Sequence, residues 1–551
     1  MTRYSYICRQ QGAEECSAKV KKSTYVPSVK TGGSTQTTET MSKKRNLLLL
    51  LLVYVLFLSP AKAQTKCFEA NDKDLVNYEV PEWYADAKVG YWAIYGLYSI
   101  PAFGSEWYGR FMYYTKDGAN KNQKNVPFGM RISDAHRKKY GNPKEFGYKD
   151  FIPMFKSEKF NADEWLDFCV EGGGKFFTMI GIFHDNFCMY DSEVNPFNSM
   201  DMGPKRDFVA ELRKATRKRG LHFGLSNHSA WNGTFFQFNK ANGFDASPET
   251  LWLYGSGKVD EAAVDRWWRQ TTEMADKYQP DLYYFDWCWN MSPLFEQRRR
   301  DFLAYYYNAA LKWNDAKYPA PGVVVNYKNR KRLPAGSAVL DLERGGMTDI
   351  EEHIWQNDTS IGEISWSYVP DERFRSANQV VDMLVDIVSK NGVLMLAFGP
   401  KADGSIPEEA HSTIGGMGAW LKTNGEAIYA TRPWSVYGEG PTVPNPKMHG
   451  DQVDYVAEDV RFTRSKDLRT LYATFLAYPG DKATIRTLKS DAISLETLRS
   501  VELIDGGECV KWTQDAEGLH LALPASLDRN EHAYALKLSF EGEIPSLRVK
   551  P

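Results

Sequence analysis

Residues 281–290 read Asp-Leu-Tyr-Tyr-Phe-Asp-Trp-Cys-Trp-Asn. Leu282 to Phe285, with Asp281 leading in, form a short apolar and aromatic run that predicts a buried β-strand. The run ends on a carboxylate, Asp286, and tryptophans follow at positions 287 and 289. A strand that delivers an acid into an aromatic pocket suits a site that cleaves sugars, whereas a lone Asp at a strand end more often caps the next turn. The rest of the chain decides between these two interpretations.

Strand-like and helix-like segments alternate on both sides of this stretch. Repeated strand–helix units with apolar strands predict a parallel sheet covered by helices. Over roughly 350 residues, the expected closure is an α/β fold of the (β/α)8-type barrel class. A doubly wound open sheet is the alternative, but no glycine-rich phosphate loop is present. The expected strands cover 88–96, 175–182, 221–225, 281–285, 322–326 and 393–398, and the expected helices cover 164–170, 207–219, 262–278, 302–313 and 379–390.

Polar side chains follow several of these strands. The chemistry of such barrels lies at the C-terminal ends of the strands. This rule places one set of residues on a single rim: Tyr95, His184, Ser226 to His228, Asp286 and Asn326.

A second carboxylate is needed if Asp286 cleaves a glycoside with retention, because one acid attacks the anomeric carbon and another protonates the leaving oxygen. Glu343 is the preferred candidate, since it precedes a Gly-Gly turn signal in a stretch that we expect to be a long loop over the rim. A solvated loop acid is the plainer interpretation. The competing acids nearby are Asp349, Glu351, Glu352 and Glu363.

Sugar contacts are also expected on the rim. His184 follows a strand and could bind a sugar hydroxyl, although a solvated loop His is equally ordinary. Glu106 and Trp107 stand together in a loop after the first strand, where simple aromatic packing is the alternative. The aromatic content of 16 Trp, 31 Tyr and 29 Phe suits a carbohydrate binder, because aromatic faces pack on the C–H faces of sugars, but a large core also uses aromatics.

The remaining sequence sets the domain plan. After Trp434, short strand candidates separated by turn residues predict a small antiparallel β-sandwich. We therefore expect a catalytic barrel over 66–434 and a sandwich over 435–551. The short strands are expected at 455–463, 470–478, 483–488, 500–504, 519–523 and 533–540.

The N-terminal part resembles an export signal. A basic segment from Met41, an apolar run over 47–58 and an Ala-x-Ala exit at Ala61 and Ala63 have the layout of a secretory signal peptide. We expect residues 41–63 to be this signal and residues 1–40 to be an unstructured upstream extension. The mature protein would then be secreted or periplasmic with no stable membrane span, and a retained signal anchor is the alternative.

Charge and motifs exclude several classes of function. The 68 Lys and Arg residues balance 70 Asp and Glu residues, so no electrostatic footprint for nucleic acid is expected. The chain has nine His, no H-E-x-x-H motif and no clear His/carboxylate ligand cluster in the sequence, so we expect no metal and no organic cofactor. A Gly-x-Ser-x-Gly elbow is also missing, which weakens a serine-hydrolase interpretation.

Ordered motifs from about residue 80 to about residue 440 resemble the α-L-fucosidases of glycoside hydrolase family 29. The matching pieces include Gly104-Ser-Glu106-Trp107-Tyr108, His184-Asp-Asn-Phe187, Tyr284-Phe-Asp286, Glu343-Arg-Gly345 with Trp355-Gln-Asn-Asp-Thr-Ser-Ile361, Leu384-Val-Asp-Ile-Val-Ser-Lys-Asn-Gly392 and Thr431-Arg-Pro-Trp434.

The resemblance implies an exo-acting retaining enzyme that acts on terminal α-L-fucose of an oligosaccharide or glycoconjugate. It implies a barrel followed by a β-sandwich, with Asp286 as nucleophile and Glu343 favoured as acid/base. It suggests Glu106, Trp107 and His184 as sugar contacts, with Trp366 lining the pocket. No metal or organic cofactor is implied.

Two departures from the family pattern concern the sugar pocket. Family members usually carry a His-Trp-Gly turn after the first strand, and here the turn is Ile94-Tyr95-Gly96. They usually carry paired His where this chain has Phe183-His184, and His228 could supply a replacement imidazole from the neighbouring rim. Lost hydrogen bonds to a hydroxyl change selectivity. The alternatives are therefore an α-L-galactosidase and a non-catalytic carbohydrate-binding protein on the same scaffold.

Overall fold

The computed structural model describes residues 66–115, 126–236, 247–290, 292–447, 449–524, 527 and 532–548. The expected extension and signal peptide over residues 1–63 lie outside the described residues. Two short helices, α3 Asp72–Leu75 and α4 Glu82–Ala87, lead into the first strand. Within the described residues, no helix combines the length and apolarity needed to cross a bilayer.

A closed barrel of eight parallel strands forms the larger part of the fold, as predicted. The strands follow one another in chain order, and β8 pairs with β1 to close the ring. Their bounds are β1 Val89–Ala93, β2 Phe176–Ile182, β3 His222–Asn227, β4 Leu282–Phe285, β5 Val324–Tyr327, β6 Val339–Glu343, β7 Trp355–Ser360 and β8 Gly392–Phe398. Gly90 permits close packing inside the ring, because a Cβ there would lie 2.1 Å from the Phe176 ring.

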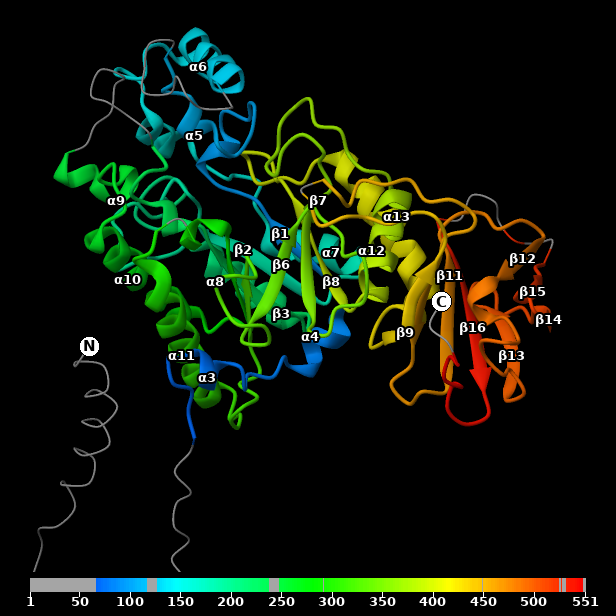
Figure 1. Cartoon of the computed structure of the whole chain (residues 1–551). Helices are drawn as coiled ribbons and strands as arrows, with labels where there is room; N and C mark the ends of the chain where they lie inside the picture. Colours follow the sequence, from blue (N-terminus) through cyan, green and yellow to red (C-terminus); the bar gives the residue numbers. More distant parts are fainter. Residues whose placement is uncertain are drawn as a thin grey trace, which may run out of the picture. The chain divides into compact units, whose positions relative to one another are not determined.

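Helices run along the outside of the barrel (Figure 1). The principal ones are α7 Ala162–Glu171, α8 Phe208–Lys218, α10 Glu261–Tyr278, α11 Phe295–Trp313, α12 Ala377–Ser389 and α13 Glu408–Asn424. The long connections after β1 and β3 add α5 Tyr108–Phe111, α6 Val126–Tyr140 and α9 Leu251–Tyr254. Helix starts are capped locally: for example, Ser376 and Gln379 form a reciprocal capping box at the start of α12.

The sequence-based prediction missed two strands, β6 and β7, and placed Glu343 in a long loop. The structure places Glu343 at the C-terminal end of β6 instead, and β7 follows it. The connections 328–338 and 344–354 contain no helix. β7 was missed because its sequence, Trp-Gln-Asn-Asp-Thr-Ser, is polar, although all six residues are buried. β6 reads Val-Leu-Asp-Leu-Glu, a short and largely apolar run that the prediction overlooked.

Tyr95 is a second correction, because its side chain does not reach the rim pocket. Its hydroxyl donates to the carbonyl oxygen of Ala402 at 3.0 Å and is hydrogen-bonded to Ser157. Its ring packs 5.3 Å from the ring of Trp165 on α7. The alternation of side chains at the end of β1 sends Tyr95 outward and Ile94 inward.

The C-terminal part consists of two antiparallel sheets, in agreement with the predicted sandwich. One has the strand order β13-β16-β11-β10-β9 and the other has the order β12-β15-β14. Side chains from both sheets, such as Phe462 and Ile485, belong to one hydrophobic cluster. The strands are β9 Arg432–Glu439, β10 Val460–Arg464, β11 Thr470–Phe475, β12 Lys482–Ile485, β13 Leu498–Leu503, β14 Lys511–Gln514, β15 Leu519–Ala522 and β16 Tyr534–Phe540. The sequence prediction missed β9 and β14, and β9 crosses the expected domain boundary at 434.

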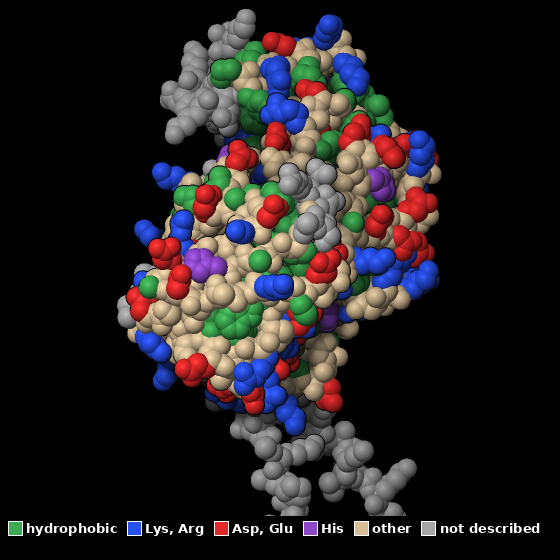
Figure 2. All heavy atoms as spheres, turned by 90° about the vertical axis from the view of Figure 1, so that its right-hand side faces the viewer, with side chains coloured by type: hydrophobic (Ala, Val, Ile, Leu, Met, Phe, Trp, Pro, Cys, Tyr) green, Lys and Arg blue, Asp and Glu red, His purple; other side chains and the backbone are tan. Residues whose placement is uncertain are grey.

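On the face shown in Figure 2, Lys and Arg side chains are interspersed with Asp and Glu side chains. This distribution matches the balanced charge of the sequence. Such a face creates no strong field of one sign.

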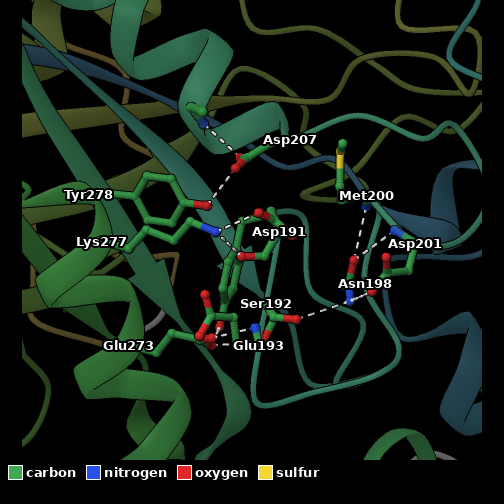
Figure 3. A network of polar contacts seen from close by, with 12 residues as sticks. Asp191, Ser192, Glu193, Asn198, Met200, Asp201, Asp207, Glu273, Lys277 and Tyr278 are labelled. Carbon is green, nitrogen blue, oxygen red and sulfur yellow. Dashed lines mark hydrogen bonds and ion pairs between the residues drawn. The ribbon is translucent and has the colours of Figure 1, made fainter.

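The loop between β2 and α8, which carries His184 near its start, is anchored to α10 (Figure 3). Glu273 of α10 accepts hydrogen bonds from the Tyr190 and Ser192 hydroxyls at 2.9 and 2.7 Å. It also accepts from the backbone N–H groups of Glu193 and Val194. One carboxylate therefore holds four groups of the loop against the outer helix.

We expect Glu273→Ala to loosen this loop. Each lost hydrogen bond is worth about 1 kcal/mol, so opening of the loop should rise at least about tenfold. The measurement is limited trypsin digestion, with cleavage expected after the exposed Lys205. Glu261→Ala, at an exposed position at the start of the same helix, serves as the control and should be cleaved at the wild-type rate. Equal cleavage of both variants would contradict the anchoring role.

A buried ion cluster joins the barrel to the C-terminal sheets. Arg461 of β10 donates to Asp386 of α12 at 2.7 Å, and Lys390 contacts the same carboxylate at 2.8 Å.

We expect Arg461→Leu to lower the free energy of unfolding by about 3 kcal/mol, because removal of one partner leaves a buried carboxylate less compensated. Urea unfolding followed by tryptophan fluorescence measures it. Arg499→Leu removes an exposed pair with Glu541 and should change the value by less than about 1 kcal/mol.

Candidate active site

A pocket of about 150 Å³ opens at the C-terminal ends of the barrel strands. All seven residues predicted as catalytic or sugar-binding line it, which brings together positions from 106 to 366 of the sequence. Its lining residues are Trp92, Ile94, Glu106, Trp107, Phe183, His184, His228, Tyr284, Asp286, Trp287, Lys328, Glu343, Asp358 and Trp366. The competing acids Asp349, Glu351, Glu352 and Glu363 do not line the pocket. The rim residues Ser226, Asn227 and Asn326 are buried but do not line it either.

Asp286 follows β4 and is surrounded by nitrogen atoms. Its Oδ2 lies 3.4 Å from His184 Nε2 and 3.6 Å from His228 Nδ1, and its Oδ1 lies 3.5 Å from Lys328 Nζ. Burial alone raises the pKa of this carboxyl, but Lys328 and the two imidazoles more than offset that effect. The pKa of Asp286 therefore lies far below its ordinary value, and the group is ionised at neutral pH.

Glu343 ends β6, and its side chain is 25% exposed at the pocket. Its Oε2 accepts a hydrogen bond from Lys328 Nζ at 2.7 Å. Burial raises its pKa and Lys328 lowers it, while the negative charges of Asp358 and Asp286 raise it further. The net shift is upward, opposite to that of Asp286. One carboxylate thus suits attack on carbon and the other suits proton donation.

Lys328 is the charged residue that the sequence-based interpretation missed. The residue follows β5, and its side chain is buried against four carboxylates. Its Nζ lies 2.7 Å from Glu343, 3.1 Å from Asp358, 3.5 Å from Asp286 and 3.6 Å from Asp341. These acids raise its pKa well above the ordinary value despite its burial, so it carries a positive charge.

Two buried acids lie behind the pair. Asp341 of β6 accepts from the Gln356 amide at 2.7 Å, and Asp358 of β7 accepts from the Tyr284 hydroxyl at 2.8 Å. Burial and the charge of Asp358 raise the pKa of Asp341 well above its usual range. This upward shift favours the neutral form of Asp341, which would reduce the negative charge around Lys328. In the sequence, Asp341 interrupts the apolar run of β6, and Asp358 lies in the polar run of β7.

The two histidines lie side by side under the pocket, with ring centroids 5.0 Å apart. His184 Nδ1 donates to the backbone carbonyl of His228 at 3.1 Å. Neither ring nitrogen of His228 has a hydrogen-bond partner among the described residues. Burial lowers the pKa of His228 to about 3, so its imidazole is neutral and can bind a hydroxyl.

The other predicted sugar contacts come from two loops. Glu106 is buried and accepts from the Ser365 hydroxyl at 3.1 Å and the Trp366 backbone N–H at 3.2 Å. Burial raises the pKa of Glu106. The Trp107 ring lies 5.8 Å from the His184 ring, and the Trp366 ring lies 5.8 Å from the Trp92 ring. These contacts bring the two loops together at the mouth of the pocket.

Ile94 and Phe183 occupy the pocket where the resembling family carries imidazoles. The Phe183 ring lies 4.5 Å from the His184 ring, 5.2 Å from the His228 ring and 4.7 Å from the Tyr98 ring. One wall of the pocket is therefore apolar, and His228 lies next to it; its role as a replacement imidazole stays a prediction.

His184, His228 and Asp286 form a cluster that the sequence spacing did not reveal. Their candidate ligand atoms lie within 4.8 Å of one another. A divalent cation there would meet the ammonium of Lys328, which lies 3.5 Å from the same Asp286 carboxylate. The repulsion between the two cations opposes metal binding, and the expectation of no metal stays a prediction.

Comparisons with known proteins place this geometry in a family. A family model described as Alpha-L-fucosidase matches residues 55–426, and a model of the α-L-fucosidase C-terminal domain matches residues 452–539. The chain is 28% identical to the tissue α-L-fucosidase of Mus musculus, over 86% of this chain and 94% of the relative. It is 28% identical to the plasma α-L-fucosidase of Homo sapiens, over 84% and 90% of the two chains.

Solved structures agree with these matches. The crystal structure of the Thermotoga maritima α-fucosidase superposes with a TM-score of 0.66 at 26% identity, over 86% of this chain and all of that one. Barrel, sandwich and sequence therefore lead to the same conclusion: the chain belongs to the α-L-fucosidase family of glycoside hydrolases.

Proposed function

We propose that this protein is an exo-acting retaining α-L-fucosidase, in which Asp286 is the nucleophile and Glu343 is first the acid and then the base. One observation carries the proposal: both carboxylates contact the same lysine ammonium, yet their pKa values shift in opposite directions. The names of the relatives supply the sugar, since they are α-L-fucosidases.

The separation of the two acids is compatible with retention. Asp286 Oδ1 and Glu343 Oε2 lie 3.5 and 2.7 Å from Lys328 Nζ. These two oxygens therefore lie at most roughly 6 Å apart, a bound that is compatible with the spacing of a retaining pair.

The reaction proceeds in two displacements. An oxygen of Asp286 bonds to C1, the bond from C1 to the leaving oxygen breaks, and the leaving oxygen keeps the electron pair and takes the proton of Glu343. A water oxygen then bonds to C1 and gives a proton to Glu343, while the bond from C1 to Asp286 breaks and returns its electron pair to the carboxylate. The products are free sugar with retained configuration and the deglycosylated acceptor.

The sugar ring fits between the aromatic and polar groups of the pocket. Trp107 and Trp366 supply flat faces for C–H groups, and Glu106, His184 and His228 supply hydrogen-bonding atoms for hydroxyls. Desolvation of the site strengthens every one of these electrostatic contacts. The substrate is a terminal sugar on an oligosaccharide or glycoconjugate, and no cofactor takes part.

Export is part of the proposal. A signal peptide over residues 41–63 would place the enzyme outside the cytoplasm, where glycan chains are exposed. The barrel over 66–434 and the sandwich over 435–551 would then constitute the mature protein.

We expect Asp286→Gly to lose activity on an aryl α-L-fucoside by about 10⁴-fold or more, because no other group can form the glycosyl-enzyme. Sodium azide should restore turnover by occupying the vacated space, and the product should be the β-L-fucosyl azide, identified by NMR. Hydrolysis by this variant at the wild-type rate would contradict the assignment of Asp286 as the nucleophile.

The variant Glu343→Ala tests the acid/base role of Glu343. Activity should fall about 100-fold or more on a natural glycan, with a much smaller loss on a 2,4-dinitrophenyl glycoside, whose leaving group needs no proton. Glu363→Ala is the control, since Glu363 pairs with Arg373 outside the pocket, and its activity should match wild type. If the wild-type protein binds fucose but hydrolyses no glycoside, the non-catalytic alternative holds instead.

α-L-Galactose is the second candidate substrate, because Ile94 and Phe183 alter the pocket. An apolar wall suits the C6 methyl group of fucose and leaves the extra hydroxyl of L-galactose unpaired, at a cost of about 1–3 kcal/mol. We expect kcat/KM for the aryl α-L-fucoside to exceed that for the α-L-galactoside by about tenfold or more.

The variant His228→Phe tests the opposite preference, for the α-L-galactoside over the α-L-fucoside. If the free nitrogens of His228 bind the C6 hydroxyl, wild type prefers the galactoside and the variant loses that preference. If wild type and the variant both prefer the fucoside, the apolar wall binds the C6 methyl group of fucose.

A further inference from the structure

Lys328 has no role in the two displacements described above, although its ammonium touches both of their carboxylates. It lies closer to Glu343 than to Asp286, at 2.7 against 3.5 Å. A lysine buried to this degree must be compensated by opposite charge, and the pocket supplies more carboxylates than neutralisation requires. Two of these carboxylates are the reacting acids, so the position of the lysine affects both of them.

We propose that Lys328 is a positioning residue shared by the two catalytic carboxylates, and that its fixed charge holds both groups and favours their ionised forms while the changing charge on Asp286 switches Glu343 from the acid of the first step to the base of the second. The inference rests on the proposed roles of Asp286 and Glu343.

The charge on Asp286 changes during the reaction, and that of Lys328 does not. In the free enzyme, ionised Asp286 disfavours a second negative charge on Glu343 and keeps its proton in place. Attack on C1 turns Asp286 into a neutral ester, while the leaving group takes the proton of Glu343. The ionised Glu343 then has Lys328 as its nearest cation, without competition from Asp286. When water displaces the ester, the charge returns to Asp286 and the proton returns to Glu343.

Asp358 and Asp341 keep Lys328 in place through this cycle. Lys328 donates to Asp358 Oδ2 at 3.1 Å, and the same oxygen accepts from the Tyr284 hydroxyl at 2.8 Å. Asp341 Oδ2 lies 3.6 Å from the ammonium, on the side of β6. A lysine held by groups that do not react cannot follow the moving charge. Its field on Glu343 is therefore the same in both steps.

The other titratable groups around this cluster are part of the charge balance. They face Lys328 or Asp286 from five elements: Asp286 and Tyr284 from β4 and its end, Asp341 and Glu343 from β6, Asp358 from β7, and His184 and His228 from the ends of β2 and β3. Lys328 differs from these groups because it is a cation that contacts both reacting acids.

The test is the pH profile of Lys328→Met. Loss of the positive charge raises the pKa of both acids, so both limbs of the kcat/KM profile should move to higher pH by about one unit or more. Because the base of the second step is weakened, the glycosyl-enzyme should accumulate. An aryl α-L-fucoside should then show a burst of released phenol, with kcat reduced at least about tenfold and KM reduced as well.

Lys328→Arg retains the charge and should keep both limbs near the wild-type positions. Lys390→Met removes another buried lysine, paired with Asp386 outside the pocket, and should leave the limbs unmoved. If Lys328→Met loses rate while both limbs stay in place, the lysine is only structural and the inference is overturned.

Asp358→Asn is the second variant, since it preserves shape if Lys328→Met does not fold. Asp358 raises the pKa of Glu343. Its neutralisation should move the basic limb to lower pH, opposite to the lysine variant. A basic limb that stays or rises overturns the inference.

Trapping with a 2-deoxy-2-fluoro-α-L-fucosyl fluoride separates this inference from the proposed function. Mass spectrometry should find the sugar on the peptide that contains Asp286. A label elsewhere refutes the proposed nucleophile. A label on Asp286 combined with unmoved pH limbs refutes only the role of Lys328.

Discussion

The site depends on one buried cation and the carboxylates that converge on it. An unpaired charge is too costly inside a barrel, so neither Lys328 nor any of its four acids could be buried alone. They come from β4, β5, β6 and β7 or from the residues directly after these strands, which are neighbours in the ring. Parallel strands present their carboxyl ends at one edge, and closure of the barrel curves that edge around a common point. The cluster is thus a direct consequence of the topology.

The aromatic surroundings turn this cluster into a reactive site. Tyr284 lies below it and its hydroxyl fixes Asp358, while Trp107, Trp287 and Trp366 line the same pocket. Exclusion of water by these rings lowers the local dielectric, so charges only a few ångströms apart act strongly on one another. At Asp286, Lys328 and the two imidazoles outweigh burial and lower the pKa, whereas at Glu343 burial and the charges of Asp358 and Asp286 outweigh Lys328 and raise it.

Sequence reasoning could predict the apolar half of the barrel and less of the polar half. The strands β2, β4 and β8 are continuous apolar runs, so the barrel and the position of Asp286 at a strand end followed from pattern alone. The strand β7 consists mostly of buried polar residues and has the composition of a loop, and β6 is a short apolar run interrupted by Asp341. Glu343 was therefore chosen for its turn signal and placed on the wrong kind of element. Lys328 was invisible because a lysine after a strand is ordinarily solvated, and only the spatial convergence of four acids reveals its burial.

Different strands of the barrel carry the reacting groups and the residues that contact the sugar. The charged cluster belongs to β4 through β7, whereas Ile94 and Phe183 follow β1 and β2. The four ion-pair partners of Lys328 are Asp286, Asp341, Glu343 and Asp358, so neither Ile94 nor Phe183 takes part in these pairs. The separation is incomplete, because the Phe183 ring packs 4.5 Å from His184, which also contacts Asp286. A change at Phe183 therefore reaches the nucleophile through one imidazole. Ile94 belongs to the same hydrophobic cluster as Phe183, so a change of sugar selectivity at either position has to be accommodated by the packing of both.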